Sequence, residues 1–170
     1  MLTIIYILVA VLGLCVGSFL NVVIYRVPNK MSIAFPNSHC PNCKEPIKWY
    51  DNIPLFSYIF LRGKCRHCNE RISIKYPFVE LLNAIMWVLC LYVFYRFGAV
   101  VYISFMIVSS ILIVISFIDF EHMIILDRFQ IMLLIIGVVL CVFGTDLNFA
   151  DRLIGFAVGG LVMALFYGLG

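Results

Sequence analysis

Apolar residues gather in five long runs along this chain, and the polar residues lie between them. The runs cover Met1 to Tyr25, 77–95, 97–118, 129–143 and, from Leu153, the rest of the sequence to Gly170. At about 1.5 Å per helical residue, the third run reaches about 33 Å, which is enough to cross a hydrocarbon core of ~30 Å. The fourth run is short unless it continues through 144–149. The pattern predicts an all-α polytopic membrane protein built as a helix bundle.

Composition supports the same class and excludes a soluble globule. The 170 residues are 64% hydrophobic and 12% charged, far from the balance of a soluble domain. The first run lacks a basic start and a small-x-small cleavage site, so it predicts a retained anchor and not a cleaved signal. Because the fifth run is still apolar at Gly170, we expect the sequence to be a C-terminally truncated part of a longer protein.

Most basic residues of the chain lie in one loop. Segments of membrane proteins that stay in the cytoplasm carry an excess of Lys and Arg, so we expect the loop 26–76 to be cytoplasmic and the N-terminus to lie outside. Alternation of the runs then places 119–128 on the cytoplasmic side as well. The basic excess could also contact membrane lipid headgroups or a phosphorylated partner, and no feature indicates nucleic-acid binding. Nine of the twelve basic residues lie in this loop: Arg26, Lys30, Lys44, Lys48, Arg62, Lys64, Arg66, Arg71 and Lys75.

The same loop contains two cysteine pairs with identical spacing. Cys40 and Cys43 form the first Cys-x-x-Cys, and Cys65 and Cys68 form the second. Two such pairs can complete the tetrahedral shell of one Zn²⁺ ion, and a loop of this size needs such a metal to gain a defined fold. Two structural disulfides are the alternative, which a reducing cytoplasmic location disfavours. The adjacent His39 and His67 are alternative ligands.

Two further stretches of the loop carry expectations about its shape. The residues 52–64, between the cysteine pairs, include apolar side chains that could pack on the metal site or lie against the membrane surface. After Cys68, the segment 71–75 alternates polar and apolar residues and predicts a short strand.

Four acidic or amide side chains interrupt the apolar runs. Asp119 directly follows the apolar stretch 111–118, so its carboxylate is expected at the cytoplasmic boundary of the third span. Ionisable groups at membrane depth are functional-site candidates. Glu80, near the start of the second run, would need a partner if buried, and it is a candidate for a substrate or cofactor pocket. Asn21 and Asn83 are placed to form hydrogen bonds between helices.

Several of these segments together resemble the bacterial type IV prepilin peptidases. The resemblance implies a bifunctional inner-membrane enzyme, which removes the basic leader of prepilins and pseudopilins as an aspartyl protease. It also implies methylation of the new N-terminus with S-adenosylmethionine. The first transmembrane helix would be 1–25, the cytoplasmic zinc-binding domain associated with methylation 26–76, and the first part of the peptidase domain 77–170. The resemblance rests on the two cysteine pairs and on the stretches 17–28, 52–68, 72–80 and 117–127.

In that family the first catalytic aspartate precedes five residues and an Ile-Pro-Asp or Ile-Pro-Asn triplet, a pattern that falls on Asp119. The triplet here ends at Asp127, and Leu126 replaces the proline. The second aspartate of the family belongs to a Gly-x-Gly-Asp motif that this sequence does not contain, and 167–170 lies inside the fifth apolar run. Because two carboxylates must share the acid and base roles, we expect these 170 residues to be inactive as a peptidase alone.

Two other functions stay open at this point. One is a zinc-dependent membrane adaptor, whose basic loop would recruit a cytosolic partner and would need the cysteines but no pair of carboxylates. The other is a methyltransferase without peptidase activity, which would keep the loop and Glu80.

Overall fold

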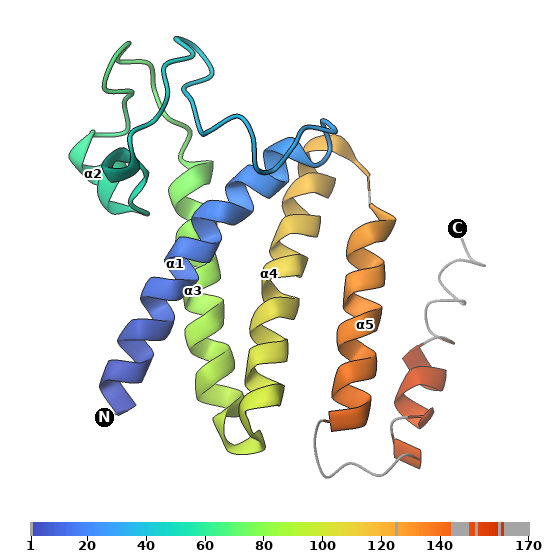
Figure 1. Cartoon of the computed structure of the whole chain (residues 1–170). Helices are drawn as coiled ribbons and strands as arrows, with labels where there is room; N and C mark the ends of the chain where they lie inside the picture. The colour runs from blue at the N-terminus through green and yellow to red at the C-terminus, as the bar shows by residue number, and fades with distance from the viewer. Residues whose placement is uncertain (1, 125, 144–149, 152, 160, 162–170) are drawn as a thin grey trace.

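The computed structural model of the chain describes residues 2–124, 126–143, 150–151, 153–159 and 161. Four long helices within 2–143 stand side by side and alternate in direction (Figure 1). Two short helices lie in the loop that joins the first long helix to the second, at one end of the bundle. The elements are α1 (Leu2–Arg26), η1 (Trp49–Asn52), α2 (Phe56–Phe60), α3 (Lys75–Phe94), η2 (Tyr95–Phe97), α4 (Ala99–His122) and α5 (Asp127–Phe143).

The predicted membrane fold is confirmed. Three described helices are long and apolar enough to span a bilayer, namely Leu2–Arg26, Lys75–Phe97 and Ala99–His122. The 17 residues of α5 extend about 26 Å, and the predicted continuation through 144–149 lies outside the described residues. The fifth run is helical at 153–159 and 161, as are 150–151 just before it, while 162–170 lies outside the described part.

The prediction of a short strand at 71–75 is wrong. Lys64 pairs with Arg71 in an isolated bridge, and no ladder extends from it in the described chain. The backbone turns immediately afterwards because the hydroxyl of Ser73 accepts the N–H of Lys75 at 3.3 Å, where α3 begins. The helix start therefore overrides the alternating pattern.

Two glycines allow α1 and α3 to approach each other closely. A Cβ atom at Gly13 would lie 2.8 Å from the Cα of Ala84, and one at Gly17 would lie 2.7 Å from the Cα of Glu80. Glycines four positions apart on one helix face let backbones meet in this way in membrane proteins. The contact places the second turn of α3 against the middle of α1.

A buried polar network joins three helices below this contact. The amide Nδ2 of Asn83 donates to the carbonyl of Gly13 at 2.7 Å, and its Oδ1 accepts from Ser110 Oγ at 2.8 Å. Trp87 Nε1 in turn donates to Ser110 Oγ at 2.9 Å. Nearer the loop, Asn21 Nδ2 donates to the carbonyl of Tyr76 at 3.1 Å. The expected interhelical hydrogen bonds of both asparagines are confirmed.

Apolar packing holds the helix ends near the loop. Ile24 of α1, Val79 of α3 and Val114 and Ile118 of α4 are fully or almost fully buried in one cluster. Phe129 of α5 joins the same cluster. The end of the bundle that carries the loop and the turn between α4 and α5 is therefore held by one apolar cluster that all four long helices share.

We predict that Gly17→Ala destabilises the bundle, because the added Cβ would have to displace the α3 backbone at Glu80. Overpacking of this kind costs about 1–3 kcal/mol. Gly137→Ala is the matched control, since a Cβ at Gly137 meets no atom within 4 Å. Thermal unfolding in detergent micelles should show a lower midpoint for Gly17→Ala only, and equal midpoints would contradict the close α1–α3 contact.

Candidate functional site

The first cysteine pair sits in a tight turn that its own backbone closes. The N–H of Cys40 donates to the carbonyl of Glu45 at 3.0 Å, and the N–H of Lys44 donates to the carbonyl of Cys40 at 2.9 Å. Lys44 has a φ of 60°, the left-handed conformation that reverses the chain. This turn brings Cys43 back beside Cys40.

The second pair repeats this turn. The N–H of Cys65 donates to the carbonyl of Glu70 at 2.8 Å, and the N–H of Asn69 donates to the carbonyl of Cys65 at 3.0 Å. Asn69, at the position equivalent to Lys44, has a φ of 57°. Two equivalent knuckles therefore face each other across the loop.

The four cysteine sulfurs converge on one point. Their Sγ atoms all lie within 4.8 Å of one another, with 3.8 Å between Cys40 and Cys68 and 4.0 Å between Cys43 and Cys65. Four thiolates around one Zn²⁺ at Zn–S distances of about 2.3 Å would lie about 3.8 Å apart, so the cluster fits this metal. All four thiols are free, and the alternative of two disulfides is not what the structure shows.

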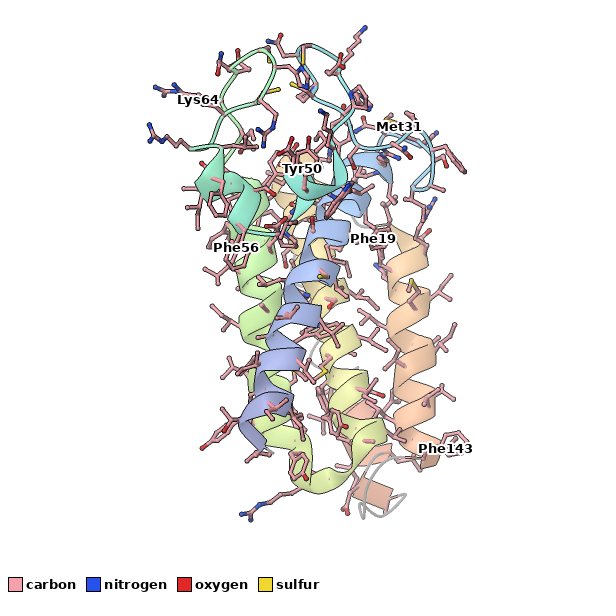
Figure 2. The ribbon with its side chains drawn as sticks, turned by 60° about the vertical axis from the view of Figure 1, so that its left-hand side comes forward. Phe19, Met31, Tyr50, Phe56, Lys64 and Phe143 are labelled. Atoms are coloured by element: carbon pink, nitrogen blue, oxygen red, sulfur yellow. The ribbon has the colours of Figure 1, made fainter. Side chains whose placement is uncertain are left out.

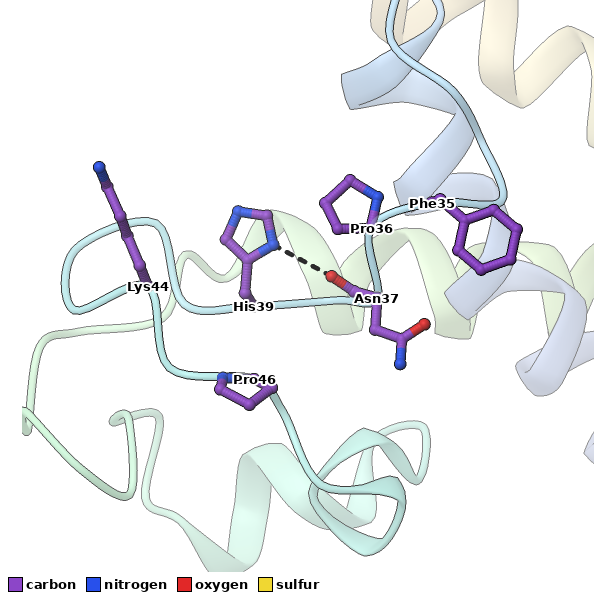
Figure 3. Close-up of a pocket in the computed structure, with 6 residues that line it drawn as sticks. All are labelled: Phe35, Pro36, Asn37, His39, Lys44 and Pro46. Carbon is purple, nitrogen blue, oxygen red and sulfur yellow. Dashed lines mark hydrogen bonds between the residues drawn. The ribbon is translucent and has the colours of Figure 1, made fainter.

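Neither adjacent histidine belongs to this cluster of potential metal ligands. Nδ1 of His39 lies 3.0 Å from the carbonyl of Asn37, and the group of ligand atoms found in the described chain contains the four cysteines without His67. His39 lines an open hollow beside the first knuckle with Phe35, Pro36, Asn37, Lys44 and Pro46 (Figure 3). No carboxylate lines this hollow, so it offers no acid–base pair.

The thiols differ in acidity. Backbone hydrogen bonds from Cys68 and His67 lower the pKa of Cys65 to about 6. At Cys43 a backbone hydrogen bond with Glu45 acts to lower the pKa, but burial and the neighbouring thiols raise it to about 11. Thiolates are the metal-binding form, so Cys65 reaches this form at a lower pH than Cys43 does.

An ion pair connects the second knuckle to η1. Arg66 donates to Asp51 through Nε at 2.8 Å and through Nη2 at 2.5 Å, a bidentate geometry that also fixes orientation. The Arg66 guanidinium lowers the pKa of the Asp51 carboxyl and lies 5.6 Å from the centre of the Tyr50 ring. The sequence analysis missed this pair because no periodic pattern relates positions 51 and 66.

Glu80 connects the loop to the bundle. The carboxylate is buried, and its Oε2 accepts the backbone N–H of Leu55 at 2.9 Å. Leu55 precedes α2 with a φ of 59°, an unusual conformation for a branched residue. The partner that burial of Glu80 requires is therefore a backbone N–H of the loop, and a role in a cofactor pocket stays a prediction.

Asp119 lies in the last turn of α4, at the end of the third span where the sequence places it. The helix continues to His122, and Met123, with a φ of 53°, ends it by donating its N–H to the carbonyl of Asp119 at 2.8 Å. The Asp119 side chain is exposed. Within the described chain it forms no hydrogen bond or ion pair with the cysteine cluster.

Asp127 is exposed at the first position of α5, so two carboxylates flank the short turn between α4 and α5. This turn lies at the end of the bundle from which the cysteine loop emerges (Figure 1). Leu126, where the resemblance noted in the sequence implies a proline, is partly buried against the apolar cluster of that end. Its carbonyl accepts the N–H of Phe129 at 3.0 Å.

Two basic residues were recognised from the sequence only as topology signals. Lys75 Nζ lies 2.5 Å from Glu121 Oε1, which ties the first residue of α3 to the last turn of α4. Arg26 is buried and donates to the carbonyls of Ser32 and Pro36 at 3.0 Å and 2.6 Å. Lys75 thus links α3 to the helix end that carries Asp119. Arg26 holds the first part of the cysteine loop against the end of α1.

Known families match both halves of the chain. Residues 11–94 match the bacterial peptidase A24 N-terminal domain, and residues 106–170 match the type IV leader peptidase family. No solved structure matches the chain.

Curated relatives carry the same assignment. A prepilin leader peptidase/N-methyltransferase of Myxococcus xanthus is 44% identical over 153 residues, which are 89% of this chain and 44% of that protein. The protein of the same name from Klebsiella pneumoniae is 36% identical over 155 residues, 88% of this chain and 67% of the relative. A type 4 prepilin-like proteins leader peptide-processing enzyme of Escherichia coli is 42% identical over 134 residues, 68% of this chain and 49% of the relative. The chain thus spans less than half of two of these relatives.

The two matched domains follow each other in the order of the family models, and the Klebsiella relative is 36% identical with 67% of its length covered. The chain therefore belongs to the type IV leader peptidase family.

Proposed function

We propose that this chain provides the cysteine-rich loop and the first catalytic aspartate of a membrane aspartyl endopeptidase. Its substrates would be type IV prepilins or pseudopilins, cleaved after their basic leader on the cytoplasmic side of the inner membrane and then methylated at the new N-terminus. One observation carries the proposal: the exposed Asp119 lies at the end of the bundle from which the four-cysteine loop emerges. The names of the relatives support the substrate class.

Hydrolysis by an aspartyl enzyme divides the work between two carboxylates. One, ionised, takes a proton from water as it attacks the peptide carbonyl, while the other, protonated, donates to the developing oxygen. Asp119 is proposed as one of the two, because its side chain is exposed and held on a rigid helix end. The second would come from a Gly-x-Gly-Asp motif that these 170 residues do not contain, so the chain alone is proposed to be inactive as a peptidase.

The four cysteines are proposed to hold Zn²⁺ in a structural role. Four protein ligands leave no open coordination position for water or substrate, as in structural zinc sites. The metal would fix the two knuckles against each other, and the bidentate contact between Arg66 and Asp51 would transmit that order to η1. Zinc therefore shapes the loop, and the carboxylates perform the hydrolysis.

The proposed methyl donor is S-adenosylmethionine. This rests on the family resemblance and on the N-methyltransferase in the names of the relatives. Glu80 is the residue proposed from the sequence for its pocket. Its Oε2 already accepts the N–H of Leu55, so any contribution to cofactor binding would come through the position of the loop or through the other carboxylate oxygen.

We predict that the wild-type chain binds one zinc ion and that Cys40→Ser lowers the bound zinc at least about tenfold, because one of the four ligands is lost. Cys15→Ser is the control, since Cys15 lies on α1 outside the cluster. Metal analysis of the purified protein and limited proteolysis of 26–76 measure the effect. A wild-type protein without zinc, or unchanged zinc in Cys40→Ser, would contradict the assignment.

The orientation is predicted to place 26–76 and Asp119 in the cytoplasm, from the excess of basic residues. In a background with Cys15 and Cys141 changed to Ser, an impermeant maleimide should give Lys48→Cys more label than the background, which keeps the loop cysteines, and only after the cells are permeabilised. Phe97→Cys, in η2 at the opposite end, should be labelled in intact cells. The reverse pattern would show that the loop faces outward.

We predict that Asp119→Asn, in the protein expressed from its full reading frame, lowers prepilin cleavage by at least about 100-fold, because a proton-transfer group is removed. Asp127→Asn should be milder, since the family pattern accepts an amide at that position. Cleavage of a prepilin with a basic leader is measured beside methylation of a precleaved substrate. Zinc content and membrane insertion should be unchanged, and full cleavage by Asp119→Asn would overturn the aspartyl assignment.

A further inference from the structure

The helix α2 lies beside the first turns of α3, one of the three helices long and apolar enough to span a bilayer. Its preceding residue, Leu55, donates its N–H to Glu80, and Glu80 follows Lys75, the first residue of α3, by five positions. Five residues correspond to about 7.5 Å along a helix axis. Figure 1 shows α2 beside the first turns of α3, below the loops that carry the cysteines. The loop therefore returns from the cysteine cluster to the level of the bundle.

The outward face of α2 is apolar. Phe56, Ile59 and Phe60 occupy positions i, i+3 and i+4, and their side chains are 57%, 69% and 82% exposed. The other face packs on the loop, where Ser57 Oγ donates to the carbonyl of Tyr50 at 3.1 Å and the ring of Tyr58 lies against Gly63. A helix on a water-facing surface shows the opposite arrangement, with polar residues outside.

Exposed apolar side chains continue on both sides of α2. Trp49, at the start of η1, is 81% exposed, and Ile53 between the two short helices is also exposed. On α3, Ile74 at its N-cap and Phe78 in its first turns are exposed as well. Tryptophan is enriched where protein meets the membrane–water boundary. The loop thus exposes apolar side chains on either side of α2 in the sequence, and α3 does so where it begins.

The same loop carries exposed cations. Lys48, Arg62 and Lys64 are exposed, and none forms an ion pair with a carboxylate in the described chain. Figure 2 shows Phe56 at the level of the helix ends and Lys64 farther from the bundle. Apolar side chains at the level of the helices with cations above them match the layers of an anionic bilayer surface.

We propose that the face formed by Trp49, Ile53, Phe56, Ile59 and Phe60 is a membrane-docking surface, which inserts into the interfacial layer of the bilayer that α1, α3 and α4 cross. The occupant is lipid and not a protein partner, because the hydrogen bond of Leu55 to Glu80 holds the face beside the first turns of a helix that is long and apolar enough to span the bilayer. Docking would fix the height of the cysteine cluster above the membrane. The inference does not depend on the proposed catalytic activity.

The test uses Trp49 as its own reporter. The chain has two tryptophans, so Trp87→Phe leaves Trp49 alone, and subtracting the spectrum of Trp49→Phe from that of the wild type isolates the same signal if Trp87→Phe fails to fold. The chain is reconstituted in phosphatidylcholine/phosphatidylglycerol vesicles with acyl chains brominated either near the headgroup or near the bilayer centre. We expect emission at short wavelength, protection from aqueous iodide and stronger quenching by the shallow bromines than by the deep ones.

A second pair of variants tests whether the α2 face is responsible. Ile59→Ser combined with Phe60→Ser should shift the Trp49 emission to longer wavelength and restore iodide quenching. Phe35→Ser is the matched control, an exposed phenylalanine in the first part of the loop, and it should leave the emission unchanged.

Two results would overturn the proposal. Trp49 that is quenched by iodide and not by either brominated lipid lies in water. Trp49 that is protected from iodide without quenching by bromolipid is covered by protein, and a dependence of that protection on protein concentration would identify a second copy of the chain as the occupant.

Discussion

The close approach of α1 and α3 is the contact on which the rest of the structure depends. Gly13 and Gly17 let the two backbones meet, which brings Asn83 to the carbonyl of Gly13 and Asn21 to that of Tyr76. The same contact holds the C-terminal end of α1 next to the N-terminal end of α3. The loop between them is therefore closed at its base by the bundle, and the entropy cost of closing a long flexible segment falls on helix packing and not on the loop itself.

A loop closed in this way still needs internal order, and three kinds of interaction provide it. The two knuckles bring four sulfur atoms within 4.8 Å of one another. Arg66 donates two hydrogen bonds to Asp51, and the carboxylate of Glu80 accepts the backbone N–H of Leu55. The two cysteine knuckles form the part farthest from the bundle, and the carboxylate of Glu80 orders the part nearest to it. The segment thus folds between two fixed ends and contains no apolar core of its own.

The features that the sequence predicts well are those that depend on composition or fixed spacing. Apolar runs predict α1, α3 and α4 because each run is long enough to span a bilayer. The two Cys-x-x-Cys motifs predict the four-cysteine cluster because two residues between the cysteines suffice for one turn. Helix ends are less predictable: α4 continues through Asp119 because Met123 supplies the left-handed cap, which no hydropathy pattern contains. The pairs Lys75–Glu121 and Asp51–Arg66 depend on tertiary placement, and the helix start at Lys75 overrides the strand-like alternation of 71–75.

The turn between Asp119 and Asp127 carries Leu126 at the position where the resemblance implies a proline. Proline restrains the backbone covalently, at any temperature. Leu126 restrains it by packing on the apolar cluster that includes Ile118 and Phe129, and hydrophobic anchoring weakens on cooling. The spacing of Asp119 and Asp127 therefore depends on the packing of a partly buried side chain, and we expect it to loosen on cooling in a way that a proline-fixed turn would not.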